Sequence, residues 1–437
     1  MQQVIITYDE LDRTGYRESV LLPLSKSIFA REAVVSALSG NIKKLIDILA
    51  IERNRGREVS QDIDILFRAL IPEHKQMVDV GASGTAMRLL LSYFALTTDT
   101  EIILSGSERI KQRPLTPLIE ALRNLGAHID CLEMDGYAPI KIGKSNLRGG
   151  HVSLDPGISS QFVTSLLLIA PYLPGGLTIE FLAPPVSVPY IHMTVEMMIY
   201  YGISVDIKKR CGHIQSIRVR QGTYREGDRA VERDWSAAAF FYMYEALADY
   251  PATMVFDHLY LDSIQGDVVT KEYFLSLGIL TTETEEKGIA LDKLDYKGPD
   301  FIEVDFEDCP DMMPAWVVTA TLLGLRFEAK GIDNLKYKES DRVLSVMSGL
   351  EKIGYKLTLQ NKNQQLILRN DLKRLPVSGP AYIDTCNDHR IAMAFTMAAI
   401  KYRDGVVLSN LCDADKSFPN FAKEAQKCGL IYNVIDK

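Results

Sequence analysis

The sequence predicts an α/β protein built from structural repeats, and two recurring patterns support this fold class. The first pattern is a helix, a glycine and an alternating strand, as in LRNLGAHIDC and LEKIGYKLTL. Each glycine has the context of a left-handed residue that ends a helix before a strand. Five glycines hold this place at successive separations of 76, 76, 76 and 75 residues, namely Gly126, Gly202, Gly278, Gly354 and Gly429. Spacing this regular indicates structural repeats.

The second pattern is a short turn of polar or small residues that opens an apolar helix. It occurs six times, as SKSIFAREAVVSAL, SGTAMRLLLSYFAL, SSQFVTSLLLIAPYL, RDWSAAAFFYMYEAL, PDMMPAWVVTATLL and NDHRIAMAFTMAAI. Each copy therefore reads as a βαβαββ unit of about 75 residues, and six copies fill the chain. The first copy is irregular, because between Gly40 and Gln61 it has the charged stretch IERNRGREVS and no matching glycine.

Composition limits the possible functions. The chain has 437 residues, 47% of them hydrophobic, which is enough for two domains with ample cores. A formal net charge of −8 argues against a broad nucleic-acid surface. The longest apolar run, residues 162–173, is far shorter than the roughly 20 residues of a membrane span, and the first residues predict neither a signal nor a transit peptide. Six scattered cysteines without a CxxC pair fit reduced thiols, so we expect a cytoplasmic protein.

The starts of the apolar helices predict anion binding. A helix N-terminus offers backbone N–H groups and about half a positive charge. At the first start, Lys26 and Ser27 precede Arg31 by about one turn, which suits a phosphate or carboxylate. A capped surface helix with a solvated cationic face is the alternative interpretation. Further cations lie in turns near other helix starts, namely Arg113, Arg342, Arg390 and Lys416.

Nine motifs run in order from Leu22 to Phe421: LPLSKSIFAR, GASGTAMR, QRPLTPL, GISSQFVTSLL, SVPYI, CPDMMPA, NLKYKESDR, TCNDHRIAMAF and DKSFP. In this combination they resemble the enolpyruvyl transferase family, in its branch that acts on shikimate 3-phosphate. The resemblance implies a two-domain inside-out α/β barrel with three βαβαββ copies in each domain, which closes over its substrates. It also implies a discontinuous domain of residues 1–22 and 232–437, a second domain of residues 23–231, and crossing strands near Pro23 and Glu232.

The resemblance implies a function as well. Members of this branch transfer the enolpyruvyl group of phosphoenolpyruvate to the 5-hydroxyl of shikimate 3-phosphate and release phosphate, in the shikimate pathway of aromatic amino-acid biosynthesis. The reaction is an addition followed by an elimination and requires no metal or organic cofactor. We therefore expect small-molecule substrates as the partners, neither nucleic acid nor a membrane, and a monomer.

Residue roles follow from the motif matches. By similarity, the shikimate 3-phosphate site comprises Ser27, Arg31, Ser159, Ser160, Gln161, Ser187, Asp311, Asn334 and Lys338. The phosphoenolpyruvate site comprises Lys26, Arg113, Arg342, Arg390 and Lys416, with the Gly84 backbone. Asp311 is the base toward the hydroxyl, Glu339 exchanges the proton at C3, and Lys26 assists the developing charge. Five cations around one ligand would repel each other in its absence, so we expect closure to depend on substrate.

The residues alone leave other interpretations open. Asp311 is also suited to cap a helix, Glu339 to a solvated position at a helix start, and Ser159 and Ser160 to capping. His389 in NDHR is taken as a structural histidine and is left out of the catalytic set.

Four positions depart from the family pattern. Leu24 stands where a small residue is usual, Ala30 and Ala82 replace side-chain amides, and Trp235 follows Asp234 where a small residue is common. Leu24 is expected to crowd the phosphoenolpyruvate pocket.

Two rival functions remain. One is the related transferase that acts on a UDP-amino sugar, but that enzyme has a cysteine in the loop that reads GSERIKQRPL here. The other is a non-catalytic paralogue that binds phosphorylated ligands, motivated by the four departures and the irregular first copy. The presence of Lys26, Asp311 and Glu339 argues against it.

Overall fold

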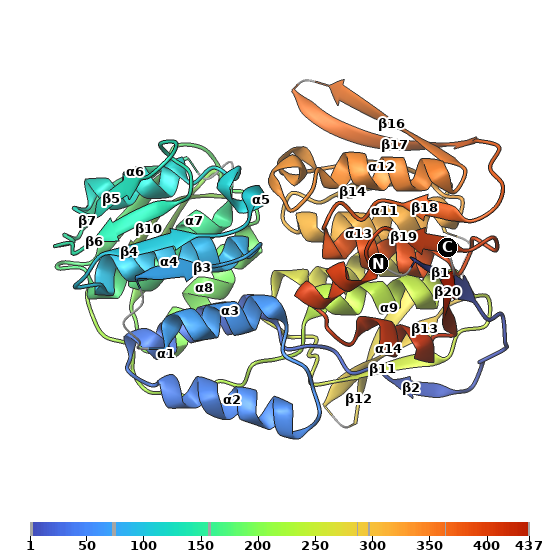
Figure 1. Ribbon diagram of the computed structural model, residues 1–437, viewed down its shortest axis with the longest axis horizontal. Helices are drawn as coiled ribbons and strands as arrows, with labels where there is room; N and C mark the ends of the chain where they lie inside the picture. The colour runs from blue at the N-terminus through green and yellow to red at the C-terminus, as the bar shows by residue number, and fades with distance from the viewer. Residues whose placement is uncertain are drawn as a thin grey trace. The chain divides into compact units, whose positions relative to one another are not determined.

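The computed structural model describes residues 3–71, 76–155, 159–285, 287–295, 298–362 and 364–435 (Figure 1). Contacts within the chain divide it into two compact units. Lys26–Val231 form one, here called the central unit, and Met1–Ser25 with Glu232–Lys437 form the other, here called the terminal unit. The resemblance had suggested boundaries at residues 23 and 232.

Five four-stranded sheets in the described residues share one topology. In each sheet the two strands at one edge are parallel, and the other two pairings are antiparallel. The orders are β3-β4-β6-β5 and β7-β8-β10-β9 in the central unit, and β2-β11-β13-β12, β14-β15-β17-β16 and β18-β19-β1-β20 in the terminal unit. A shared strand order confirms that the sequence periodicity reflects structural repeats.

The strands of the central unit are β3 (Met77–Asp79), β4 (Ile102–Ser105), β5 (His128–Cys131), β6 (Ile140–Gly143), β7 (Gly150–Leu154), β8 (Leu177–Phe181), β9 (Val205–Arg210) and β10 (His213–Val219). Those of the terminal unit are β1 (Gln3–Tyr8), β2 (Arg17–Ser19), β11 (Thr253–Asp257), β12 (Ile279–Thr284), β13 (Gly288–Lys293), β14 (Phe301–Asp305), β15 (Arg326–Lys330), β16 (Tyr355–Lys362), β17 (Gln365–Arg374), β18 (Ala381–Ile383), β19 (Val406–Leu408) and β20 (Leu430–Ile435).

The N-terminal segment completes two sheets of the terminal unit. Strand β1 pairs antiparallel with both β19 and β20, and β2 pairs parallel with β11. Two repeats therefore take one strand each from a part of the chain that is distant in sequence. The chain leaves the terminal unit after Ser25 and re-enters it at Glu232. There an antiparallel bridge joins Leu24 to Arg233, and the Ser25 N–H donates to the Glu232 carbonyl at 2.8 Å.

The six predicted apolar helices are confirmed as the inner helices of the two units. They are α1 (Lys26–Leu38), α4 (Gly84–Thr97) and α7 (Ser160–Ile169) in the central unit, and α9 (Trp235–Leu247), α11 (Met313–Leu322) and α13 (His389–Ala398) in the terminal unit. Within each unit the three helices pack on one another. Every residue of α9, α11 and α13 is buried.

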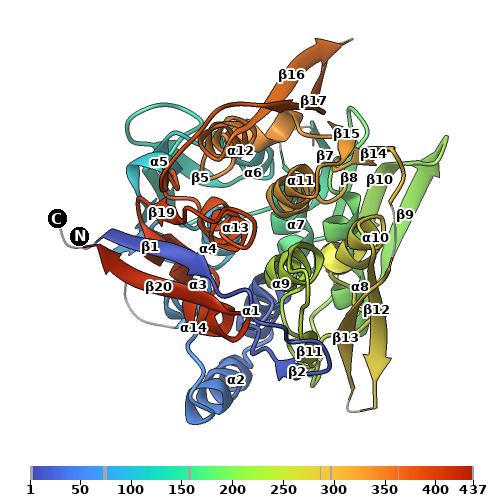
Figure 2. The same cartoon turned by 90° about the vertical axis from the view of Figure 1, so that its right-hand side faces the viewer.

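In the terminal unit, Figure 2 shows these three helices surrounded by β1 and β20, β12 and β13, and β16 and β17. Helices inside and sheets outside are the inside-out arrangement that the resemblance implied. Helices of this kind need no polar face, which is why the sequence pattern is apolar all round.

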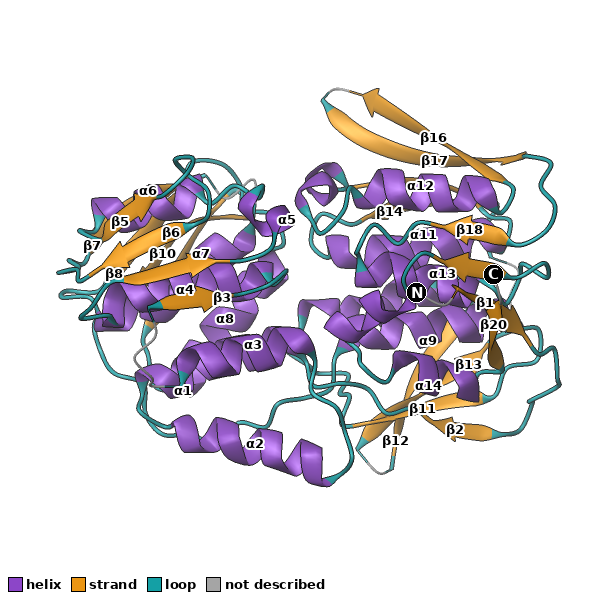
Figure 3. Ribbon diagram, in the orientation of Figure 1, coloured by secondary structure: helices purple, strands orange, loops and turns teal. Residues whose placement is uncertain are grey.

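The outer helices precede the five spaced glycines. They are α6 (Thr116–Asn124), α8 (Val188–Tyr200), α10 (Thr270–Leu275), α12 (Arg342–Lys352) and α14 (Phe421–Lys427). All five glycines have φ between 85° and 98°, and a strand follows each (Figure 3). The predicted left-handed helix ends are confirmed, since this backbone region favours glycine.

The first copy is helical in place of a sheet. Residues 26–71 contain α1, α2 (Ile42–Asn54) and α3 (Gln61–Leu70), with no strand in that described stretch. The apolar spacing of α3 explains its conformation, because Ile63, Leu66, Phe67 and Leu70 follow helical periodicity and are buried. Helix α2 is held by a buried ion pair between Lys44 Nζ and Glu32 Oε1 at 2.8 Å.

The remaining helical segments are α5 (Glu108–Lys111), η1 (Ala170–Tyr172), η2 (Gly266–Val269), η3 (Pro310–Met312), η4 (Asp333–Tyr337) and η5 (Leu411–Lys416). In the part of the chain that the structure describes, no helix has the length and apolar character needed to cross a bilayer.

Candidate active site

The predicted site residues of the terminal unit include a connected network of ion pairs centred on Asp311. Its Oδ1 atom lies 3.0 Å from Lys338 Nζ and 2.7 Å from Arg342 Nη1. Its Oδ2 atom accepts from Arg390 Nη2 at 3.1 Å. One carboxylate thus contacts three cations.

A second carboxylate, Glu339, extends this network. Its Oε2 atom accepts from Arg342 Nη2 at 2.8 Å, and its Oε1 atom accepts from Lys416 Nζ at 2.8 Å. The Arg342 side chain is only 1% exposed, and its Nε atom donates to Oδ2 of the fully buried Asp388 at 2.8 Å. Arg342 therefore bridges three carboxylates, and the network brings together all predicted site residues of this unit except Asn334.

Helix starts place these side chains. Asp311 lies in η3 directly before α11, Arg342 is the first residue of α12, and Arg390 is the second residue of α13. Asp388 caps α13 by accepting from the Arg390 N–H at 3.0 Å.

The turn before Asp388 is strained. Cys386 and Asn387 both have φ of 53°, a left-handed conformation that L residues rarely adopt. Strain of this kind, held in place by the surrounding structure, is typical of functional sites.

The interpretations of Asp311 and Glu339 as a helix cap and a solvated carboxylate are wrong. Cys309 and Met312 hold the N-cap positions of η3 and α11, and neither cap is Asp311. The Glu339 side chain is 14% exposed and is engaged by two cations. Both carboxylates consequently belong to the ion-pair network.

The cations set the protonation of the network. Burial by itself raises the pKa of Asp311, but Arg390, Lys338 and Arg342 together hold that pKa well below its ordinary value. Burial lowers the pKa of Lys338, with Asp311 acting in the opposite direction. The pKa of Arg342 is raised despite burial, because Asp388, Glu339 and Asp311 surround it. At neutral pH Asp311 is therefore a carboxylate.

In the central unit, Arg31 is buried and fully engaged at the predicted cradle. Its Nε atom donates to Thr194 Oγ1 at 2.8 Å, and its Nη atoms donate to the Ser27 and Tyr190 carbonyls and to Thr164 Oγ1. Burial lowers the pKa of Arg31 to about 10. The solvated cationic face proposed as an alternative is wrong, since Arg31 is only 4% exposed.

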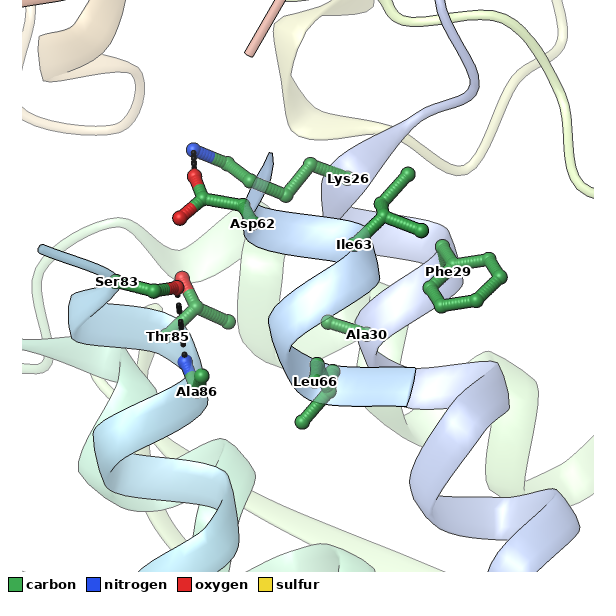
Figure 4. Close-up of a pocket in the computed structure, with 9 residues that line it drawn as sticks. All are labelled: Lys26, Phe29, Ala30, Asp62, Ile63, Leu66, Ser83, Thr85 and Ala86. Atoms are coloured by element: carbon green, nitrogen blue, oxygen red, sulfur yellow. Dashed lines mark hydrogen bonds and ion pairs between the residues drawn. The ribbon is translucent and has the colours of Figure 1, made fainter. Parts of the chain in front are cut away.

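Lys26 has a partner that the sequence did not reveal. Its Nζ atom lies 2.8 Å from Asp62 Oδ2, on α3 of the irregular first copy. Figure 4 shows this pair at one end of a small, mostly apolar pocket between the starts of α1, α3 and α4. Ala30 lines the pocket, together with Ser83 and Thr85 at the start of α4.

Gly84 and Arg113 lie side by side. A β-carbon added to Gly84 would lie 2.4 Å from Arg113 Nη1 and 2.7 Å from Arg88 Nη1. Only glycine permits this approach of the two guanidinium groups to the start of α4.

Gln161 joins the same group. Its Oε1 atom accepts from Arg88 Nη1 at 2.9 Å, and its Nε2 atom donates to Thr85 Oγ1 at 3.1 Å. The starts of α4 and α7 are thereby connected.

The predicted serines occupy helix starts. Ser159 caps α7 by accepting from the Gln161 N–H at 3.3 Å, so its capping role is confirmed, and Ser160 is the first residue of that helix. Ser187 holds the N-cap position of α8 in a left-handed conformation, with φ of 53°. Asn334 lies in η4, four residues before Lys338.

Four of the five cations of the predicted phosphoenolpyruvate site are paired with carboxylates of their own unit, and the expected dependence of closure on substrate stays a prediction. Lys26 is paired with Asp62, Arg342 and Arg390 with Asp311, and Lys416 with Glu339. Carboxylates of the protein occupy these cations, so an anionic ligand has to compete with them.

Comparison with known proteins identifies the family. The model of the family described as EPSP synthase (3-phosphoshikimate 1-carboxyvinyltransferase) matches residues 19–424. The chain belongs to the EPSP synthase family. A 3-phosphoshikimate 1-carboxyvinyltransferase of Bacteroides fragilis is 35% identical over 414 residues, covering 95% of this chain and 96% of the relative. A 3-phosphoshikimate 1-carboxyvinyltransferase of Syntrophobacter fumaroxidans is 31% identical over 436 residues, covering 95% of this chain and 97% of the relative.

A solved EPSP synthase structure from Acinetobacter baumannii has the same fold. It superposes with a TM-score of 0.71 over 100% of both chains at 21% identity.

The four departures from the family pattern have separate structural settings. Leu24 is buried in the bridge to Arg233, and its effect on phosphoenolpyruvate stays a prediction. Trp235 is fully buried, and its Nε1 atom donates to the Tyr260 carbonyl at 3.2 Å. Ala30 lines the pocket beside Lys26, whereas Ala82 is exposed.

Two carboxylates that pair with candidate site residues of this EPSP synthase family member were not predicted from the sequence. Asp388 stands in the NDHR motif, where its position before an apolar helix signals a cap but not a partner for Arg342. Asp62 lies in the irregular copy, between the motifs LPLSKSIFAR and GASGTAMR, in a stretch that matches no motif.

Proposed function

We propose that this chain transfers the enolpyruvyl group of phosphoenolpyruvate to the 5-hydroxyl of shikimate 3-phosphate and releases phosphate. The observation that carries the proposal is the Asp311 network, in which two carboxylates suited to proton transfer are held by four cations suited to an anionic substrate. Family membership supports the same activity.

The two substrates need different surroundings, and the two groups of residues suit them. Phosphoenolpyruvate carries a carboxylate and a phosphate, and is bound by Lys26, Arg113, Arg342, Arg390 and Lys416 with the Gly84 backbone. Shikimate 3-phosphate is bound by hydroxyl, amide and cationic groups, namely Ser27, Arg31, Ser159, Ser160, Gln161, Ser187, Asn334 and Lys338, and by Asp311 at the reacting hydroxyl.

In the proposed mechanism Asp311 accepts the proton of the 5-hydroxyl as the oxygen attacks C2 of phosphoenolpyruvate. Glu339, in its protonated form once the substrate binds Arg342 and Lys416, delivers a proton to C3, and Lys26 stabilises the developing charge. In the second step Glu339 takes a proton back from C3, the C2–C3 double bond re-forms, and the bond from C2 to the phosphate oxygen breaks. Phosphate leaves with the proton that Asp311 returns, which restores both residues. No step uses a metal or an organic cofactor.

The ion pairs explain how the carboxylates become active. When the anionic substrate binds Arg342, Arg390 and Lys416, it weakens their ion pairs with Asp311 and Glu339. Burial then raises the pKa of Asp311, because the cations that held it low are engaged elsewhere. A carboxylate with a higher pKa is the stronger base, so substrate binding prepares the proton acceptor.

A phosphate-release assay tests the proposal. The purified chain is supplied with phosphoenolpyruvate and either shikimate 3-phosphate or UDP-N-acetylglucosamine, and only the first pair is expected to give turnover. Turnover with phosphoenolpyruvate and UDP-N-acetylglucosamine, but not with shikimate 3-phosphate, would assign the chain to the related transferase that acts on a UDP-amino sugar. No turnover, together with retained binding of shikimate 3-phosphate by calorimetry, would instead indicate a non-catalytic paralogue.

We also propose that the enzyme is a monomer of the cytoplasm. All six cysteines are free thiols, which suits a reducing compartment. Sedimentation equilibrium tests whether the enzyme is a monomer, and fractionation of the source cells tests whether it is cytoplasmic.

A further inference from the structure

One turn of the terminal unit, Gln265–Asp267, touches several segments that carry site residues. Gln265 is only 2% exposed, and its Oε1 atom accepts from Ser25 Oγ at 2.7 Å and from the Trp235 N–H at 3.2 Å. Its Nε2 atom donates to the Arg233 carbonyl at 2.8 Å. The turn is thus fixed to both segments through which the chain passes from one unit to the other.

The same turn is attached to the segment that carries Asp311. Cys309 Sγ donates to the Gly266 carbonyl at 3.1 Å, two residues before Asp311. With both ends of the turn held, the residue that follows Gly266 has a defined position.

That residue, Asp267, is 4% exposed and faces α9. Its Oδ2 atom accepts from Ser236 Oγ at 2.5 Å, and Ser236 Oγ in turn accepts from Arg390 Nη2 at 3.1 Å. A serine hydroxyl has one proton and two lone pairs. Because the Ser236 hydroxyl donates its hydrogen bond to the Asp267 carboxylate, a lone pair of the Ser236 oxygen is left to accept from the guanidinium of Arg390.

Arg390 is therefore held from two sides. On one side its Nη2 and Nη1 atoms donate to Asp311 Oδ2 at 3.1 Å and to the Asp311 carbonyl at 3.2 Å. On the other side Nη2 donates to Ser236. Without a fixed acceptor at Ser236, the guanidinium would lose one of the contacts that position it, and its contact with Asp311 is one that an anionic substrate has to weaken.

We propose that Asp267 is a positioning residue that orients Arg390 for phosphoenolpyruvate through the Ser236 hydroxyl. In this proposal Asp267 does not contact the substrate. It accepts the hydrogen bond of the Ser236 hydroxyl, so the Ser236 oxygen stays available as an acceptor for Arg390 when Arg390 leaves Asp311. The inference rests on the proposed function, in which Arg390 binds phosphoenolpyruvate. It adds a residue pair, Ser236 and Asp267, outside the predicted site.

The test measures phosphate release with each substrate varied in turn, for the wild type, Asp267→Asn, Ser236→Ala and the double variant. For both single variants we expect the KM for phosphoenolpyruvate to rise by about 10-fold or more, because a small displacement of a binding group is costly. The KM for shikimate 3-phosphate is expected to stay within about twofold of the wild type. The double variant is expected to be no worse than the poorer single variant, since the two residues act in series.

The matched control is Asp257→Asn, an exposed carboxylate at the end of β11, which should keep wild-type kinetics. An unchanged KM for phosphoenolpyruvate in folded Ser236→Ala would overturn the inference, even if Asp267→Asn fails to fold. Equal increases in both KM values, or additive effects in the double variant, would overturn it too. A wild type without turnover refutes the proposed function itself, whereas an active wild type with unaffected variants refutes only the inference.

Discussion

Arg342 donates through Nε to Oδ2 of Asp388 at 2.8 Å, inside a region from which solvent is almost excluded. Its Nη1 atom reaches Asp311 and its Nη2 atom reaches Glu339. A planar guanidinium presents donors in several fixed directions, so one side chain can orient three carboxylates at once. Before substrate binds, Arg342 thereby fixes both proposed catalytic carboxylates relative to the buried Asp388.

Replacing Arg342 by lysine should disable this arrangement while keeping the charge. A single ammonium cannot reach three carboxylates with the same geometry, so kcat/KM for phosphoenolpyruvate should fall by about 100-fold or more. Disrupting a buried ion pair should also lower the free energy of unfolding, by about 3 kcal/mol. Steady-state kinetics and denaturant titration measure the two effects. Arg326→Lys, at an exposed arginine of β15, is the control, and an Arg342→Lys enzyme as active as this control would contradict the assignment.

Glu339→Gln should separate chemistry from binding. Glutamine keeps the shape of the side chain but cannot exchange a proton, so turnover should fall by about 100-fold. Shikimate 3-phosphate affinity, measured by calorimetry, should change little. Glu328→Gln, which removes a partly exposed ion pair with Arg369 at 3.1 Å, should leave both quantities as in the wild type. A matching loss of affinity and turnover in Glu339→Gln would assign Glu339 to substrate binding.

The repeats were predictable because the backbone geometry at each helix end requires a particular residue type, which is visible in the sequence. A glycine such as Gly202 or Gly354 is required where a helix ends with positive φ, and that requirement recurs with each copy. The conformation of the first copy was not predictable from the repeat. Its helix α2 depends on the buried Lys44–Glu32 pair, which joins two positions with no recognisable motif.

The repeat length also explains which site contacts form. Asp311 and Arg390 are 79 residues apart, Glu339 and Lys416 are 77 apart, and Thr85 and Gln161 are 76 apart. These are equivalent places in neighbouring copies, so within each unit the repeat brings helix starts together. The sequence identified the residues, but not that the cations would be paired with protein carboxylates, because pairing depends on side-chain geometry in the packed unit.

Gly84→Ala should weaken phosphoenolpyruvate binding without unfolding the protein. The added methyl would lie 2.4 Å from Arg113 Nη1, and the far end of this flexible side chain can move to relieve the clash. We expect a KM for phosphoenolpyruvate raised by about 10-fold and a nearly unchanged melting temperature. Gly222→Ala is the matched control, since its new β-carbon would meet only Ile203 Cδ1 at 3.6 Å, an ordinary contact. Unaltered kinetics in Gly84→Ala would show that the Arg113 position is not important for the substrate.

Glu245 links stability to pH and is not a member of the Asp311 network. It lies on the buried helix α9, and its Oε2 atom is buried without a hydrogen-bond partner in the described part of the chain. Burial, reinforced by Asp292, raises the pKa of Glu245 from its usual 4.5 to about 8. Between these two pKa values the folded state holds a proton that the unfolded state releases. Stability attributable to this group is therefore greatest below about pH 4.5 and is lost as pH rises toward 8.

Glu245→Gln should remove this pH dependence, because glutamine has no proton to lose. The wild type should lose up to about 1.4 kcal/mol of unfolding free energy per pH unit from this group across the window, and the variant should not. Denaturant titrations at intervals from pH 5 to about pH 9 measure the difference between variant and wild type, which cancels the contribution of other titrating groups. Glu283→Gln, at an exposed glutamate of β12, should keep the wild-type slope. Parallel stability curves for Glu245→Gln and the wild type would mean that Glu245 ionises in the folded protein at its ordinary pKa.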